Sequence, residues 1–393
     1  MTIPRRILPA VAISQFAGTS LWFAINAVMP DLQKNTGLPP ETVGWLTAAV
    51  QIGFIAGTLV FALLAVADRF SPRLVFLASS LAGALLALAT ALLPPTMAEL
   101  VVLRVATGVC LAGIYPVGMK IASGWYAEGL GLALGVLVGA LVLGTALPFG
   151  LRAVGADWPW QSVMAIVAAV AAAGGALMAL AVPDGPHLAR RPAASDLSPR
   201  ALAVIWSDRR LRASVLGYFG HMWELYAFFV LLTPIVALRW LGAAASWWVF
   251  AAIGVGVFSC VGGGLLARRF GGARVAGVQL ACSGSCAVLA PWLLDAPLWL
   301  WAPWLLLWGA TVSGDSPQFS ALTAANAPRA LVGSVLTLVN SIGFAISVAT
   351  ITAFVSLAAV WPLARVLPWL AVGPAIGVLC LRPLLQQGSA RPR

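Results

Sequence analysis

Two ionisable side chains interrupt an apolar stretch near the middle of the chain. The segment GHMWELYAFF, residues 220–229, contains His221 and Glu224, which are three residues apart and would share one face of a helix. An apolar environment disfavours the charged forms of both groups, so a carboxyl and an imidazole in contact there can exchange protons near neutral pH. We therefore predict that Glu224 carries a proton during function, with His221 as its hydrogen-bond partner or relay. The alternative is a structural hydrogen bond that holds this helix to a neighbour.

A second carboxylate lies in the apolar segment 297–323. Asp315 shares a helical stripe with Trp308, Thr311 and Gln318, and the nearby Pro317 would bend the helix. Three roles remain open for Asp315: binding substrate, carrying a proton, or pairing with an arginine of a gate.

Arg104 is the one full-strength cation well inside an apolar segment. It shares a helical face with Gly108, Leu111 and Tyr115. An anionic substrate or a carboxylate partner would satisfy its charge. Lys120, near the end of the same segment, points to the other side and is expected to lie at the membrane interface.

These charges stand in a chain with the composition of a membrane protein. Of its 393 residues, 61% are hydrophobic and 9% are charged, and the mean hydropathy is +0.97, whereas soluble domains are roughly 25% charged. The net charge of +11 comes from arginines between apolar segments, not from one basic face, so we predict no nucleic-acid partner. We predict a multi-pass protein surrounded by the lipid bilayer.

Several functional classes are not expected. The chain has no Gly-rich phosphate-binding loop that ends in Lys-Ser/Thr, so nothing suggests ATP-driven transport. His221 and Glu224 lack a third ligand on a nearby helix, which argues against a metal site and an intramembrane enzyme. We predict no enzyme activity, no bound metal and no cofactor.

The apolar runs predict twelve transmembrane helices in two groups of six. They lie near 7–30, 41–66, 74–93, 97–122, 130–151, 160–181, 213–237, 244–266, 274–294, 297–323, 330–356 and 362–381. The polar, Pro- and Arg-rich stretch between the groups predicts a bundle over 1–182, a linker over 183–212 and a second bundle over 213–393. With these spans nearly all arginines fall on one side, which places both termini and the linker in the cytoplasm.

The two halves look like copies of one unit. Asp68-Arg69-Phe70 after the second span aligns with Arg268-Arg269-Phe270 after the eighth, and Pro116 of the fourth span aligns with Pro317 of the tenth. Matches at nearly one offset predict two pseudo-symmetric six-helix bundles.

These motifs resemble those of the major facilitator superfamily of secondary transporters, over essentially the whole chain. The first loop keeps Asp68, Arg69 and Arg73 of the family's Gly-x-x-x-Asp-Arg-x-Gly-Arg-Arg signature, and RVATGVCLAG resembles its Arg-x-x-x-Gly motif. TSLWFAINAVMPDL, GDSPQFSAL and LVNSIGFAIS are similar to a bacterial branch labelled cyanate/nitrate-permease-like. The resemblance implies an all-helical membrane fold and a monomer.

The resemblance also implies where the functional residues lie, because helices one, four, seven and ten line the family's central cavity. It suggests these substrate-binding residues: Gln15, Thr19, Trp22, Asn26, Arg104, Tyr115, Gln318 and Asn340. From their own position inside apolar segments, and not from the resemblance, Glu224, His221 and Asp315 are the candidates for proton coupling. The cytoplasmic gate falls to Asp68, Arg69, Arg73, Arg268 and Arg269.

The expected function is alternating-access transport of a small molecule across the bacterial cytoplasmic membrane, coupled to protons. A small organic or inorganic anion is favoured, because Arg104, His221 and Lys120 can supply positive charge. Proton-coupled efflux of amphipathic or cationic compounds is the alternative, supported by Glu224, Asp315 and the aromatic residues. An uncoupled facilitator remains a third interpretation.

Overall fold

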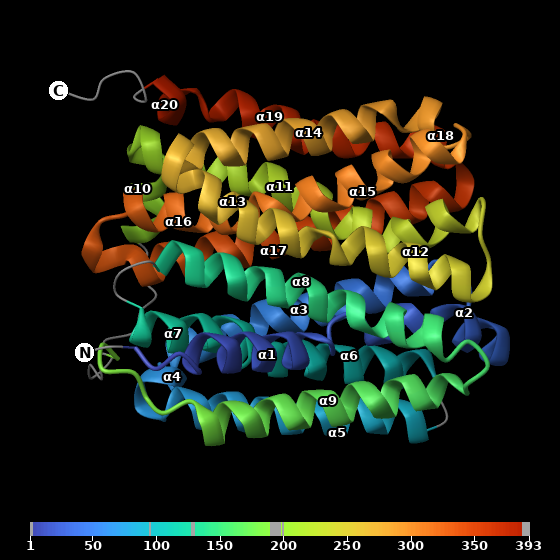
Figure 1. Cartoon of the computed structure of the whole chain (residues 1–393), viewed down its shortest axis with the longest axis horizontal. Coiled ribbons are helices and arrows are strands. Elements are labelled where there is room, and N and C mark those ends of the chain that lie inside the picture. Colours follow the sequence, from blue (N-terminus) through green and yellow to red (C-terminus); the bar gives the residue numbers. More distant parts are fainter. Residues whose placement is uncertain (1–2, 94–95, 127–129, 189–197, 199, 387–393) are drawn as a thin grey trace.

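The computed structural model describes residues 3–93, 96–126, 130–188, 198 and 200–386, and within them it is entirely helical (Figure 1). The helices of the first half are α1 (Ile7–Thr19), α2 (Ala24–Thr36), α3 (Thr42–Leu63), α4 (Val66–Arg69), α5 (Pro72–Leu92), α6 (Met97–Ala112), α7 (Tyr115–Trp125), α8 (Leu130–Val154) and α9 (Trp160–Ala181). Those of the second half are α10 (Arg200–Ser207), α11 (Arg209–Ala237), α12 (Gly242–Gly254), α13 (Gly256–Phe270), α14 (Gly272–Leu293), α15 (Leu298–Gly314), α16 (Ser316–Asn326), α17 (Val332–Val360), α18 (Leu363–Val366), α19 (Val372–Cys380) and α20 (Arg382–Leu385), with short 3-10 helices η1 (Arg329–Leu331) and η2 (Leu367–Ala371).

The helices account for all twelve predicted spans. Eleven helical stretches of the described chain, with short interruptions included, are long and apolar enough to cross a membrane. The remaining span, the tenth, is present as α15 and α16, which Asp315 separates, so that α15 alone has 17 residues. The chain is therefore a multi-pass integral membrane protein with the predicted number of spans.

Four spans are broken near their middle. The breaks of the fourth and tenth spans precede Pro116 and Pro317, each of which lies in the first turn of the helix that follows. Proline has no backbone N–H to donate and is well accommodated in a first turn. The eighth span is interrupted at Val255 between α12 and α13, and the first span unwinds over residues 20–23 between α1 and α2. The break in the first span contains no proline.

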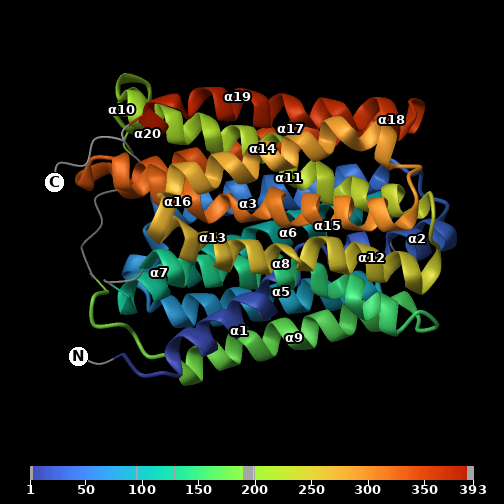
Figure 2. The same ribbon diagram turned by 45° about the horizontal axis from the view of Figure 1, so that its top comes forward.

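The helix positions support the internal repeat. In the first half α3 begins at Thr42 and α5 at Pro72, and in the second half α12 begins at Gly242 and α14 at Gly272. In Figure 1 the first-half helices α5 and α9 lie together at one extreme of the molecule, and α14 and α19 lie at the other. In the turned view of Figure 2, α9 and α19 are still at opposite extremes. Helix α10 falls inside the predicted linker.

The halves meet through two symmetry-related pairs of spans, α3 with α17 and α8 with α12 and α13. Small residues permit the close approach of the second pair. A Cβ atom built on Gly135 would lie 3.1 Å from the carbonyl oxygen of Cys260, and one on Gly139 would lie 3.1 Å from the side chain of Val257.

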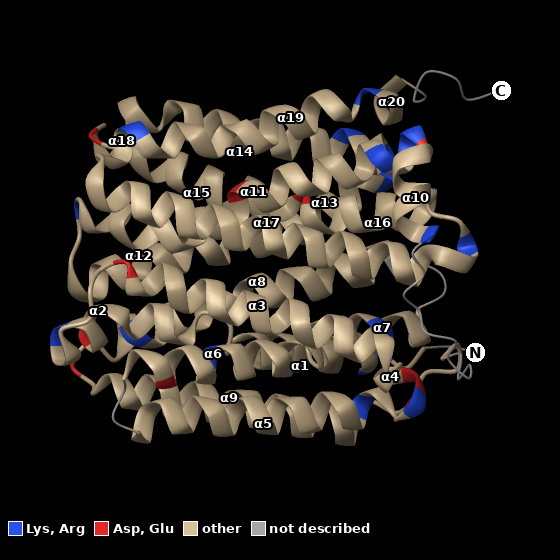
Figure 3. Ribbon diagram, turned by 180° about the vertical axis from the view of Figure 1, so that it is seen from behind, with Lys and Arg blue, Asp and Glu red and all other residues tan. Residues whose placement is uncertain are grey.

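One end of the bundle is much more basic than the other. Lys and Arg residues gather around α4, α7, α10 and α16, and α1 begins and α20 ends at this same end (Figures 1 and 3). We call it the basic end; the opposite end carries α2, α18 and the start of α12. Four arginines of the predicted cytoplasmic side lie outside the described residues, namely Arg190, Arg191, Arg391 and Arg393.

Candidate functional site

The break in the first span is held by Arg104 of α6. The Nη1 atom of Arg104 donates to the carbonyl oxygen of Leu21 at 3.1 Å, and its Nη2 atom donates to the carbonyl oxygen of Trp22. Unwinding leaves carbonyls without helical partners, and a guanidinium can satisfy two of them together. Arg104 is 3% exposed, and no carboxylate contacts it in the described part of the chain. The carboxylate partner considered from the sequence is therefore replaced by two neutral carbonyls.

The glycine of the Arg-x-x-x-Gly motif explains how α6 comes close enough to α3. A Cβ atom on Gly108 would lie 2.0 Å from the carbonyl oxygen of Val50, and one on Gly53 would lie 2.0 Å from that of Val105. The two helix backbones thus touch at reciprocal glycines.

Five aromatic residues close the space between the two bundles. Trp22 packs against Phe54, Tyr226 and Phe344, with ring centroids 5.0, 5.8 and 5.6 Å away, and against the edge of Tyr115. The rings of Trp22 and Tyr226 are inclined by 20°, and those of Trp22 and Phe344 by 21°. We call this set, Trp22, Phe54, Tyr115, Tyr226 and Phe344, the aromatic cluster. It joins the first, second and fourth spans to the seventh and eleventh.

Buried polar groups without partners lie beside the aromatic cluster. Asn26 Nδ2 donates to Thr47 Oγ1 at 2.8 Å, about two turns along α3 from Phe54, which contacts Trp22. Gln51 lies between Thr47 and Phe54 on the same face of α3. Its side chain is fully buried, and neither its oxygen nor its nitrogen has a hydrogen-bond partner; the same holds for the indole nitrogen of Trp22.

Gln51, Phe54 and Tyr226 were not predicted from the sequence. For Gln51 and Phe54, a usable signal was present in the sequence. The spacing of Thr47, Gln51, Phe54 and Thr58 places polar and aromatic residues on one face of an apolar helix.

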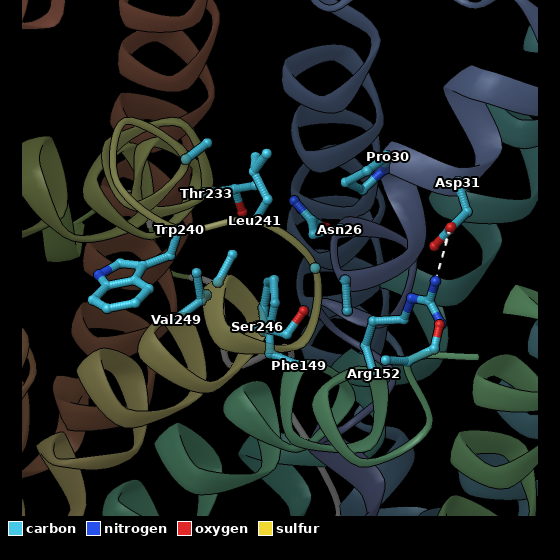
Figure 4. Close-up of a pocket in the computed structure, with 15 residues that line it drawn as sticks. Asn26, Pro30, Asp31, Phe149, Arg152, Thr233, Trp240, Leu241, Ser246 and Val249 are labelled. Atoms are coloured by element: carbon cyan, nitrogen blue, oxygen red, sulfur yellow. Dashed lines mark hydrogen bonds and ion pairs between the residues drawn. The ribbon is translucent and has the colours of Figure 1, made fainter. Parts of the chain in front are cut away.

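Pockets approach the aromatic cluster from both ends. At the end away from the basic residues, a cavity of about 260 Å³ extends from the Asp31–Arg152 ion pair to Asn26 (Figure 4). A second cavity of about 250 Å³ also reaches Asn26. At the basic end, another pocket reaches Thr58 and Pro116, which neighbour Phe54 and Tyr115 in the helices. The cluster therefore separates the two sets of pockets.

Glu224 is held by two donors from other spans, not by His221. Its Oε2 atom accepts from Ser283 Oγ of α14 at 2.7 Å, and its Oε1 atom accepts from Trp308 Nε1 of α15 at 2.7 Å. Glu224 is 1% exposed. The prediction that His221 is the hydrogen-bond partner of Glu224 is thus wrong, because the neighbouring spans supply closer groups to each of them.

His221 instead pairs with Asp315 at the break of the tenth span. The distance from His221 Nδ1 to Asp315 Oδ1 is 2.7 Å, and both side chains are at most 1% exposed. Asp315 precedes the first residue of α16, where a negative charge is favoured by the helix dipole. Of the three roles considered for Asp315, the structure shows a close side-chain contact, but with a histidine and not with a gate arginine.

The other predicted substrate-binding residues do not gather at the aromatic cluster. Thr19 Oγ1 donates to the carbonyl oxygen of Gln15 at 2.8 Å, and Gln15 itself is buried against Gly118 inside the first bundle. Gln318 lines a pocket at the basic end. Asn340 is partly buried on α17.

The predicted gate residues do not meet across the two bundles in the described structure. Asp68 pairs with Lys120 of α7 at 2.5 Å, so Lys120 is an ion-pair partner and not only an interfacial residue. Arg73 donates to the carbonyl oxygen of Ala179 at 3.2 Å. Three arginines, Arg69, Arg268 and Arg269, are exposed, and the guanidinium of the last stacks over the ring of Phe270. The loop takes its shape from Ala65, which adopts a left-handed backbone conformation with φ 48°.

No group of three or more His, Cys, Asp or Glu side chains in the described residues is arranged to hold a metal ion. The site offers two buried carboxylates, Glu224 and Asp315, together with the ring faces and unpartnered polar groups at the aromatic cluster.

Comparison with known proteins agrees with this architecture. The family model described as Major Facilitator Superfamily matches residues 11–377. Among solved structures, the chain is similar to the human organic anion transporter MFSD10 (TETRAN), with 16% identity, coverage of 96% of this chain and 99% of that chain, and a TM-score of 0.73. It is also similar to the proton:xylose symporter XylE bound to 6-bromo-6-deoxy-D-glucose, with 13% identity, coverage of 97% and 96%, and a TM-score of 0.74. A comparison with curated protein sequences finds no match.

The family model covers all twelve spans apart from the first few residues of α1 and the last few of α19. The two solved structures share the complete fold. The chain belongs to the Major Facilitator Superfamily.

Proposed function

We propose that this membrane transporter couples movement of a small anion to movement of protons, with Glu224 as the proton-carrying group. Membership of the superfamily makes the chain a transporter and not an enzyme. The observation that carries the coupling proposal is a buried carboxylate whose two oxygens each accept a single hydrogen bond from a neighbouring span. We place the basic end in the cytoplasm of a bacterium, on the positive-inside rule.

The groups around Glu224 can form hydrogen bonds with both its charged and its protonated form, but only Oε2 can carry the proton. Trp308 Nε1–H can only donate, so a proton on Oε1 would face another hydrogen. Ser283 Oγ lies 2.7 Å from Oε2 and 3.1 Å from the carbonyl oxygen of Leu280. Its hydroxyl can therefore donate to Glu224 when the carboxylate is charged. When Oε2 is protonated, the Ser283 hydroxyl can donate to the carbonyl oxygen of Leu280 and accept a hydrogen bond from Glu224 Oε2.

The distribution of buried charge supports an anion as substrate. Arg104 brings a positive charge into the first bundle, and its contacts are with neutral carbonyls. The other two side chains considered as sources of positive charge already have partners, since His221 contacts Asp315 and Lys120 contacts Asp68. Arg104 thus carries the anion proposal alone. In the alternative, efflux of a cationic compound, Glu224 and Asp315 would meet the positive charge of the substrate.

The pockets at the two ends support alternating access. The aromatic cluster joins both bundles, so rocking of one bundle against the other would open one set of pockets toward the cluster as the other closes. Protonation of Glu224 changes the charge buried in the second bundle and so shifts the balance between conformations.

The test is substrate-driven proton movement in proteoliposomes loaded with a pH-sensitive dye, with anions and lipophilic cations screened in parallel. We expect an anion to drive proton flux in the wild type and in Glu99→Gln, where an exposed carboxylate near the start of the fourth span is changed. Glu224→Gln should abolish the flux. Transport of a labelled solute without proton flux would make the protein a facilitator or exchanger, and flux that persists in Glu224→Gln would remove Glu224 from the coupling role.

A further inference from the structure

We infer that the substrate is a flat organic anion, an aromatic or heteroaromatic carboxylate, whose ring stacks within the aromatic cluster and whose carboxylate accepts from buried donors beside it. This inference rests on the proposed transport function and specifies its substrate class. It depends on three features of one location: near-parallel rings, polar groups without partners and a positive charge without a carboxylate partner.

The rings of the aromatic cluster already stack on one another across the bundle interface. Tyr226 and Phe344 belong to the second bundle, and their rings are inclined to that of Trp22 of the first by 20° and 21°. When the bundles separate, these faces lose their partners. A planar ring can take the same place between them, because stacked aromatic rings favour separations and orientations like those already present.

The unpartnered polar groups are suited to a carboxylate. Trp22 Nε1–H can only donate, and the Gln51 carboxamide carries two N–H donors; both side chains are fully buried and none of these donors is used. A buried donor without an acceptor is unfavourable unless something occupies the site. A carboxylate offers two oxygens and about four lone pairs, enough for the indole and the carboxamide together.

Arg104 supplies positive charge next to the aromatic cluster. The guanidinium donates to the carbonyl of Trp22 itself, so its charge lies directly behind the cluster. Its Nε atom is buried and has no partner. A buried charge is normally compensated by an ion of opposite sign, and an anionic substrate would provide one.

Other ligand classes meet only part of this arrangement. An inorganic anion such as nitrate satisfies the charge but is too small to fill the stack of rings. An aromatic cation would find the rings favourable but would be repelled by Arg104. A flat uncharged amide would satisfy the donors and leave Arg104 uncompensated.

The experiment measures binding to the full chain in lipid nanodiscs by calorimetry. The flat probes are benzoate, nicotinate and indole-3-carboxylate, and the comparison probes are cyclohexanecarboxylate, benzamide, benzyltrimethylammonium and nitrate. We expect at least one flat carboxylate to bind, with benzoate about 2- to 10-fold tighter than cyclohexanecarboxylate because only a planar ring stacks. Tighter binding of any comparison probe, or no binding of the three flat carboxylates, would overturn the inference.

Three variants test the assigned location. Trp22→Phe keeps the ring but removes the indole N–H, and Gln51→Leu removes the carboxamide; each should weaken binding of the flat carboxylate about 5- to 100-fold. Trp301→Phe is the matched control, because Trp301 is equally buried, its indole nitrogen also has no hydrogen-bond partner, and it lies near Arg239, away from the cluster. Equal effects of Trp22→Phe and Trp301→Phe would contradict the location.

The same probes separate this inference from the proposed function. Each probe that binds is tested for proton movement in proteoliposomes of wild type and Glu224→Gln, with protein-free liposomes reporting passive entry of the acid. A cation or a non-planar acid that drives Glu224-dependent flux would leave proton coupling intact and refute the flat-anion inference. A flat carboxylate that binds but drives no such flux would support the substrate class and refute the coupling.

Discussion

The two oxygens of Glu224 differ in what they can accept, and this difference makes a prediction at the scale of single residues. Trp308→Phe keeps an aromatic ring against Phe228, with which the indole stacks at 4.4 Å, but removes the donor to Glu224 Oε1. Leaving a buried carboxylate oxygen without a partner should lower the free energy of unfolding by about 1–3 kcal/mol.

A double-mutant cycle with Glu224→Leu isolates this contact, because the loss from Trp308→Phe should largely vanish once the carboxylate is gone. The measurement is unfolding of the detergent-solubilised protein. Trp301→Phe serves again as the control, because the indole N–H of Trp301 makes no hydrogen bond that the substitution could remove. A full loss from Trp308→Phe in the Glu224→Leu background would show that the effect comes from packing and not from the hydrogen bond.

Sequence reasoning identified the important charged residues but not their partners. Glu224, Asp315 and Arg104 stand out because a charge inside an apolar span is unfavourable without a reason. Their contacts, however, come from residues on other spans: Ser283 and Trp308 for Glu224, and the backbone of Leu21 and Trp22 for Arg104. Spacing along one helix predicts which side chains share a face, and it cannot predict which helix packs opposite. For this reason, spacing along the helix led to the wrong prediction that His221 is the hydrogen-bond partner of Glu224.

At the scale of helices, the contact between α3 and α6 depends on two glycines. Gly108→Ala would place a Cβ atom 2.0 Å from the carbonyl oxygen of Val50, a backbone atom that cannot move without shifting α3. We expect a loss of folded protein, with destabilisation of at least about 1–3 kcal/mol, as for other overpacked cores.

Gly262→Ala in α13 is the matched control, because nothing lies within 4 Å of its Cβ position. Alanine there should be neutral or stabilising by roughly 0.5–1 kcal/mol, since it favours the helix. Yield and thermal unfolding of both variants check the prediction. A Gly108→Ala protein as stable as Gly262→Ala would contradict the close packing.

Proline positions predict some of the breaks in the spans but not the break in the first span. Pro317 correctly predicted a disturbance of the tenth span, and Pro116 marks the matching break in the fourth. The first span has no proline at residues 20–23, and its unwinding is stabilised by Arg104 from another helix. This break could not be predicted from local sequence, because its cause lies about 80 residues away.

At the scale of the whole molecule, the twelve spans and the basic end were predicted from hydropathy and arginine positions, because the bilayer imposes length and charge rules on each span. The repeat was predicted from the matching loop motifs and from Pro116 and Pro317. Placement of the substrate residues was less successful. Trp22 and Tyr115 lie in the aromatic cluster, whereas Gln15 and Thr19 pack inside the first bundle. A helical stripe assumes one continuous helix, whereas residues 20–23 are not helical, so helical spacing does not hold between residues before and after the break.

Alternating access coupled to Glu224 requires the two ends to move in opposite senses. Spin labels at Lys34 and Leu241 report the end that carries α2, and labels at Phe70 and Phe270 report the basic end; all four side chains are exposed. The distances within each pair are measured by electron–electron double resonance in nanodiscs, in a cysteine-free background.

The most direct test of the account is to record both distances as the pH is lowered, in the wild type and in Glu224→Gln. We expect acidification of the wild type to shift the two distance distributions in opposite directions, one end opening as the other closes. In Glu224→Gln both distributions should stay the same at every pH, because the side chain no longer titrates. Wild-type distances that do not respond to pH, or a Glu224→Gln protein that responds as the wild type does, would contradict the account.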